Sequence, residues 1–154
     1  MKLIYPIAIL LIGIAGYSCN GKQKSEQTET TSPTREMYLT AQDTAAVKQL
    51  VNLFMGHAMA HHIDSAVGLL RYVDRSVSTK PLPLNESAGM KASEMLNKYP
   101  VLDYSLSYMA FHNAYNNEVL CNVKTIDEIT LKLTFTPVRY FGCWSLCLRG
   151  IDDR

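Results

Sequence analysis

The stretch Asp43–Val73, DTAAVKQLVNLFMGHAMAHHIDSAVGLLRYV, decides the fold that the sequence predicts. Its apolar residues recur at three- and four-residue steps, which places them on one face of a helix. The members of this first face are Val47, Leu50, Val51, Phe54 and Ala58. Asp64 then interrupts the pattern, and a second, shorter apolar face begins at Ala66. The stretch therefore predicts a helical hairpin.

Capping residues place the ends of these helices. Thr40–Asp43 has the S/T-x-x-D form of a capping box and precedes the first apolar face. We expect the first helix to run to about His61, and Asp64 with Ser65 to cap the second. A third helix is expected after Asn85, which is a good N-cap residue. Its apolar face consists of Ala88, Ala92, Met95, Leu96 and Tyr99.

After residue 100 the periodicity changes to the alternation that is typical of strands. In the first strand the alternation predicts one shared face for Tyr104, Leu106, Tyr108 and Ala110. Further strands are expected at 119–123, 129–135 and 144–149, with turns at 113–117 and 137–142. In the last strand we expect Trp144, Leu146 and Leu148 on a buried face. Helices followed by strands predict an α+β fold, with the helices packed on a curved antiparallel sheet.

The N-terminus predicts export. Residues 1–18 combine Lys2 with an apolar run, Leu3–Ala15, that is shorter than the roughly 20 residues of a membrane-spanning helix. This pattern is typical of a secretory signal. Gly16-Tyr17-Ser18-Cys19 resembles the lipobox of bacterial lipoproteins, although Gly16 and Tyr17 depart from it. The resemblance implies that Cys19 becomes an acylated (palmitate-type) N-terminus. Ordinary signal cleavage remains the alternative.

The segment after Cys19 predicts a tether beneath that anchor. Residues 19–36 are polar and lack large apolar side chains, so we expect them to be disordered and the folded domain to span 37–154. Asn20 is not the aspartate that retains lipoproteins of this type in the inner membrane. The resemblance therefore implies a location at the outer membrane, with the protein attached to the membrane through its lipid.

Charge and cysteine content exclude some partners. Loss of residues 1–18 removes one basic residue from 15, which leaves 14 basic and 14 acidic residues. A neutral chain argues against nucleic acid as a partner. The three remaining cysteines are Cys121, Cys143 and Cys147. In an antiparallel meander two strand steps, roughly 9–10 Å, separate Cys121 from the others, whereas a disulfide needs Cα atoms within about 7 Å. We therefore expect buried or half-buried thiols.

Two segments resemble the NTF2-like superfamily, which is also called cystatin-like α+β. The residues His62–Leu70 are similar to its inter-helix segment, and Phe141–Leu146 to its terminal strand with a Gly-x-Trp motif. The resemblance covers about Glu36–Asp152. It implies a cone-shaped sheet with a cavity against the helices. The fold hosts dehydratases, isomerases and non-catalytic proteins, so the resemblance implies no single function.

The candidate binding residues lie on and around the first strand. They are Asp103, Tyr104, Tyr108 and His112. Asp103 is the best candidate for a pocket carboxylate, but a solvated strand end is the better explanation of this residue, and the same holds for His112. His57 and His61 share a helix side, but the H-E-x-x-H pattern is absent, so we expect boundary histidines and no metal or other cofactor.

These observations leave two functions open. The first is an envelope lipoprotein with a non-catalytic domain that binds a small molecule, a glycan or a protein partner. The alternative is a cavity enzyme of the dehydratase or isomerase type. A carboxylate or histidine with a strongly shifted pKa inside a cavity would favour this alternative. No acid–base pair stands out, so we favour the first and assign no catalytic residue. The sequence leaves the oligomeric state open, a dimer included.

Overall fold

A computed structural model describes residues 39–74, 78 and 80–150. The predicted signal, the lipidation at Cys19 and the tether at 19–36 lie outside these residues. In the described part of the chain, no helix is both long enough and apolar enough to cross a membrane.

Helix α1, Ala41–Met59, begins at the predicted capping box. The Thr40 hydroxyl accepts a hydrogen bond from the Asp43 backbone N–H, and the Asp43 carboxylate accepts one from the Thr40 backbone N–H. This reciprocal pair satisfies two of the donors that a helix start leaves unpaired. The buried apolar face of α1 consists of Val47, Val51, Phe54, Met55 and Ala58. The expected first helix is therefore confirmed.

Helix α2, Ile63–Leu69, starts one residue before Asp64, so the prediction that Asp64 and Ser65 cap it is wrong. The N-cap is His62, whose side chain makes no capping hydrogen bond. His61 takes a left-handed backbone conformation with φ +58°, which reverses the chain within two residues. Asp64 instead lies in the first turn, where a negative charge favours the helix dipole.

Helix α3, Glu86–Lys98, is capped as predicted. The Asn85 side chain accepts a hydrogen bond of 2.8 Å from the backbone N–H of Ala88. Its buried face consists of Ala88, Ala92 and Leu96. Two short strands, β1 (Arg71–Tyr72) and β2 (Leu82–Pro83), pair between α2 and α3.

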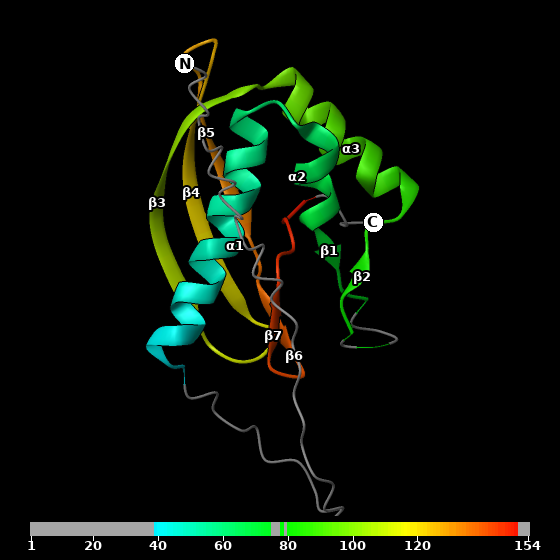
Figure 1. Ribbon diagram of the computed structural model, residues 1–154, viewed down its shortest axis with the longest axis vertical. Coiled ribbons are helices and arrows are strands. Elements are labelled where there is room, and N and C mark those ends of the chain that lie inside the picture. Colours follow the sequence, from blue (N-terminus) through cyan, green and yellow to red (C-terminus); the bar gives the residue numbers. More distant parts are fainter. Residues whose placement is uncertain (1–38, 75–77, 79, 151–154) are drawn as a thin grey trace, which may run out of the picture. The chain divides into compact units, whose positions relative to one another are not determined.

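The main sheet is an antiparallel meander in the order β3–β4–β5, formed by Val101–Phe111, Asn117–Thr125 and Thr130–Phe135. The C-terminal segment then pairs beside β5, because Phe135 forms an antiparallel bridge with Leu148. Helix α1 lies along one face of this curved sheet, α2 packs beside α1, and α3 packs beside α2 (Figure 1). The α+β fold class and the predicted strand order are confirmed.

A bulge in β3 contradicts the predicted alternation. The register with β4 shifts between Leu106 and Tyr108. As a result Tyr104, Leu106, Met109 and Phe111 pack against the core, whereas Tyr108 is exposed. The prediction that Tyr104 and Tyr108 share a face is therefore wrong, because one extra residue in a strand sends every later side chain to the other side.

The segment 137–142, expected to be a turn, contains a strand. β6 (Val138–Tyr140) pairs with β7 (Cys143–Ser145) in a hairpin whose two-residue loop is Phe141–Gly142. The expected alternation after Trp144 is also wrong, because Leu146, Cys147 and Leu148 are buried in succession. This segment lies between two neighbours: Leu146 pairs with Leu70, and Leu148 pairs with β5.

Aromatic packing joins the helices to the sheet. The Phe54 ring of α1 meets the Phe135 ring of β5 edge-on, with centroids 5.2 Å apart, and both side chains are fully buried. Cys121 is a buried thiol, Cys147 is buried and Cys143 is half-buried, and no disulfide links these three described residues. The expected burial of these cysteines is confirmed.

Candidate binding site

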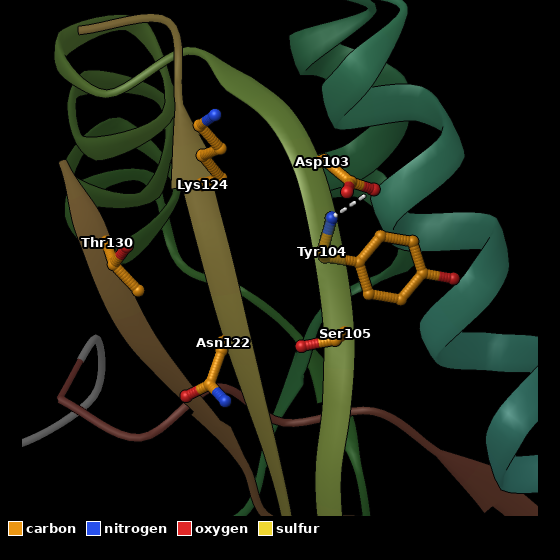
Figure 2. A pocket seen from close by; sticks show the side chains of 6 residues that line it. All are labelled: Asp103, Tyr104, Ser105, Asn122, Lys124 and Thr130. Atoms are coloured by element: carbon orange, nitrogen blue, oxygen red, sulfur yellow. Dashed lines mark hydrogen bonds between the residues drawn. The ribbon is translucent and has the colours of Figure 1, made fainter. Parts of the chain in front are cut away.

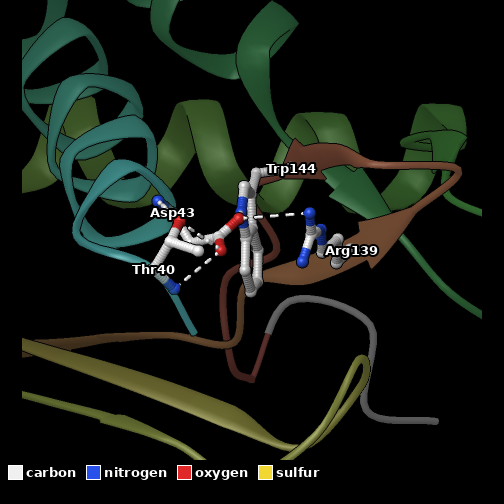
Figure 3. A network of polar contacts seen from close by, with 4 residues as sticks. All are labelled: Thr40, Asp43, Arg139 and Trp144. Atoms are coloured by element: carbon white, nitrogen blue, oxygen red, sulfur yellow. Dashed lines mark hydrogen bonds and ion pairs between the residues drawn. The ribbon is translucent and has the colours of Figure 1, made fainter. Parts of the chain in front are cut away.

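A pocket of about 320 Å³ lies between the start of α1 and the β6–β7 hairpin. Its lining residues are Thr40, Gln42, Asp43, Ala46, Arg139, Gly142 and Trp144. We call it the Asp43–Trp144 pocket. Figure 3 shows its polar members, with the Trp144 ring between the Thr40–Asp43 turn and the Arg139 side chain. It joins two segments about a hundred residues apart in the sequence.

The Asp43 carboxylate is the centre of this pocket and is almost completely buried. One oxygen accepts hydrogen bonds from the backbone N–H and the hydroxyl of Thr40, at 3.0 and 2.8 Å. The other accepts from the indole N–H of Trp144 at 3.0 Å and forms a 3.4 Å ion pair with Arg139. Both carboxylate oxygens are therefore occupied by donors.

This environment keeps Asp43 ionised. Burial by itself would raise the pKa of the carboxyl, since a charge is less stable away from water. The hydrogen bonds from the Thr40 backbone, the Trp144 indole and the Thr40 hydroxyl outweigh burial, and the Arg139 charge adds to them. The pKa of Asp43 therefore lies below its ordinary 3.8. Such a carboxylate holds no proton at neutral pH.

Trp144 is held on several sides. Its N–H donates to Asp43, and Phe111 packs edge-on against its ring at a centroid distance of 5.5 Å. The Arg139 guanidinium lies 6.0 Å from the ring centroid, at the outer limit of a cation–π contact. Trp144 was predicted as a core residue, but it is half-buried: it packs partly against the core and partly lines the pocket.

Arg139 supplies the positive charge of the pocket. Its backbone N–H donates to the Ala114 carbonyl at 2.8 Å, which ties β6 to the turn between β3 and β4. Its side chain keeps 32% of its surface exposed. A guanidinium has five N–H donors, and the contact with Asp43 is long, so Arg139 can still donate to a ligand.

A second, smaller hollow of about 190 Å³ lies on the sheet face away from the helices (Figure 2). It is lined by Asp103, Tyr104, Ser105, Asn122, Lys124 and Thr130. The Asp103 carboxylate accepts a 2.8 Å hydrogen bond from the backbone N–H of Tyr104, on its own strand. The hollow therefore contains one acidic side chain, Asp103, and one basic side chain, Lys124, on neighbouring strands.

The structure does not gather the predicted binding residues in one cavity. Asp103 and Tyr104 both border the outer hollow, but the Tyr104 hydroxyl donates to Asn52 of α1 at 2.7 Å. Tyr108 lies beyond the bulge and is exposed, and a hydrogen bond with Glu118, with a smaller contribution from burial, raises its pKa. His112 is exposed at the end of β3.

The histidine cluster remains on the surface at the end of α1. The His57 and His62 rings are 6.2 Å apart and tilted. Within the described ranges, no group of three or more His, Cys, Asp or Glu side chains is close enough to hold a metal ion.

The pocket itself escaped sequence reasoning. The capping box already accounts for Asp43, strand alternation accounts for Trp144, and Arg139 lies where the sequence predicts a turn. The one signal in the sequence is that an acid, an arginine and the single tryptophan are residue types able to line a polar pocket, but nothing in their spacing brings them together.

Comparison with known proteins supports the fold. The structure is similar to that of an NTF2-like protein of unknown function from Methylobacillus flagellatus KT, with a TM-score of 0.52 and 9% identity. The match covers 75% of this chain and 98% of that one. No protein-family model matches the sequence, and no curated protein matches it significantly. At 9% identity the likeness shows the fold alone: the chain has an NTF2-like α+β fold.

Proposed function

We propose that the protein is an envelope lipoprotein whose NTF2-like domain is a non-catalytic binding module. Its ligand site is the Asp43–Trp144 pocket, and its ligand is a small polar molecule or one sugar ring of a glycan. The volume of about 320 Å³ is at the lower end of the range for small-molecule sites, which suits a single ring.

The observation that carries this proposal is the full occupation of the Asp43 carboxylate. A general base works best with a pKa near the working pH and with an oxygen available to the substrate. Asp43 has a lowered pKa, and its two oxygens already accept from Thr40 and Trp144. The group therefore supports the geometry of the pocket, and the dehydratase or isomerase alternative has no proton acceptor there.

The rest of the lining suits a polar ring. Trp144 provides an aromatic surface, while Arg139 and Gln42 provide donors at the rim. Asp43 compensates the charge of Arg139, so the pocket has little net charge and favours neutral or zwitterionic ligands.

Binding can be measured through Trp144, which is the single tryptophan of the chain. Titration with N-acetylglucosamine, galactose and their short oligomers is expected to change the tryptophan emission with saturation. Arg139→Gln should weaken binding at least tenfold. Arg149→Gln is the matched control, because Arg149 pairs with Glu118 on the surface, and it should leave binding unchanged. An unresponsive emission, or equal losses in both variants, would refute the site.

The proposed location in the cell envelope rests on the lipobox-like segment Gly16–Cys19, and it is tested separately. Mass spectrometry of the protein isolated from expressing cells is expected to show a mature N-terminus at Cys19 that carries acyl chains. An unmodified Cys19, or cleavage elsewhere, would refute lipid attachment without affecting the pocket.

A further inference from the structure

The tip of the β6–β7 hairpin presents an aromatic side chain to the solvent. Phe141 is 89% exposed, more than any other large apolar side chain in the described part of the chain. Its ring meets the Tyr140 ring edge-on, with centroids 4.6 Å apart. Burying a phenylalanine is favourable, and here the fold does not do so. Phe141 is therefore not explained by packing.

The backbone at the tip makes phenylalanine a poor choice for the turn itself. Phe141 has φ +46° and Gly142 has φ +81°. Two consecutive residues with positive φ are typical of a type I′ hairpin, in which Asn-Gly is the favoured pair. A bulky residue in this region is strained, and strained backbone positions cluster at functional sites. This strain points to a role in contact with a partner.

The tip lies at the end of the domain where the chain enters. Gly142 and Thr40 line the same pocket, and Thr40 immediately precedes α1. Figure 1 shows the hairpin and the start of α1 at the same end of the described domain. The chain from Leu39 back to Cys19 has nineteen intervening residues, and the two ends can lie at most about 70 Å apart when this segment is fully extended.

We propose that Tyr140 and Phe141 form a contact that inserts into the interfacial layer of the lipid bilayer. The proposal rests on the lipid anchor of the proposed function, because the tether then keeps the tip close to the bilayer. Tyrosine suits the headgroup level, and phenylalanine suits the boundary of the acyl chains. The pocket beside the tip would then open close to the membrane surface.

The expected strength of this contact is modest. Transfer of one exposed phenylalanine side chain out of water favours the bound state roughly ten- to hundredfold. This factor is too small to recruit a free domain, but it is sufficient to orient a domain that a tether already holds at high local concentration. The lipid anchor would therefore determine attachment, and the tip would determine orientation.

The four phenylalanines allow the test without an added probe. The full chain, isolated from cells grown with 4-fluorophenylalanine, is reconstituted into bicelles of phosphatidylethanolamine and phosphatidylglycerol. Fluorine NMR then reports all four side chains, of which Phe54 and Phe135 are fully buried internal controls. A spin label on the lipid acyl chains should broaden the Phe141 resonance at least twofold more than theirs. Equal broadening, or none, would overturn the proposal.

The variant Phe141→Asn tests the lipid contact without destabilising the domain. Asparagine tolerates positive φ, so the thermal midpoint should stay the same or rise while the contact with lipid is lost. Loss of the signal from both buried phenylalanines would show misfolding. Both the Asn and the Leu variant lack the fluorine at position 141, so their contact with lipid is read as quenching of Trp144 emission by the spin-labelled lipids, because Trp144 lines the pocket beside the tip. Phe141→Leu, which stays apolar, should keep most of this quenching, and Phe141→Asn should lose it. Trp144 titrations and N-terminal mass spectrometry on the same sample show separately whether pocket binding and lipid attachment hold.

Discussion

Replacing Asp43 with alanine should destabilise the domain by about 2.5–5 kcal/mol. Loss of the hydrogen bonds that the Asp43 carboxylate accepts from the Thr40 backbone N–H and hydroxyl costs about 1 kcal/mol. Loss of the hydrogen bond between the Trp144 indole and a charged acceptor costs about 1.5–3 kcal/mol. The Arg139 ion pair adds under about 1 kcal/mol, because it is long and one partner is a third exposed.

Urea unfolding followed by far-ultraviolet circular dichroism measures this change without relying on the tryptophan. Asp64→Ala is the matched control, since Asp64 lies in the first turn of α2 and makes no cap. It loses only its interaction with the helix dipole and should change the free energy of unfolding by less than about 1 kcal/mol. Trp144→Phe, introduced into the wild-type protein and into Asp43→Ala, should give a coupling energy between the two side chains of at least about 1 kcal/mol. Additive effects, or a loss below about 1 kcal/mol for Asp43→Ala, would refute the reasoning.

Three further predictions concern acid, the buried thiol and the core. The pKa of Asp43 in the folded protein lies below its ordinary 3.8, so its contribution to stability is present above that pH and is lost as the pH falls through the folded pKa. In Asp43→Asn the free energy of unfolding should therefore fall less steeply as the pH is lowered. Burial raises the pKa of Cys121 to about 11, so peptide mapping after iodoacetamide treatment near neutral pH should find Cys121 alkylated in urea and protected in the folded protein. Phe54→Ala should cost about 3–5 kcal/mol in urea unfolding, because it opens a cavity beside Phe135, whereas Leu53→Ala at an exposed position should cost under about 0.5 kcal/mol.

The features that sequence reasoning placed correctly are those with a local cause. Thr40 and Asn85 cap their helices through side chains that bond to a backbone three residues away. The buried residues of α1 follow from its periodicity, and the meander follows from short turns between successive strands. Each of these can be derived within a window of a few residues.

The features that it missed depend on distant neighbours or on single backbone angles. The β3 bulge lies in a run where tyrosine, serine and methionine suit either face, so the sequence does not mark the shift before Tyr108. The reversal at His61 depends on one positive φ at a residue that is not glycine. The link between Asp43 and Trp144 escaped because each residue already had an adequate local explanation.

That link also affects when the domain can fold. The Asp43–Trp144 hydrogen bond joins residues 101 positions apart, and the Arg71 backbone donates to Leu146 across a similarly long loop. Contacts between such distant positions require the loop to close first, which slows folding. During synthesis, α1 emerges long before the C-terminal residues that hold its start and fill the space beside β1. The nascent chain therefore lacks these closing contacts until its C-terminal segment is made.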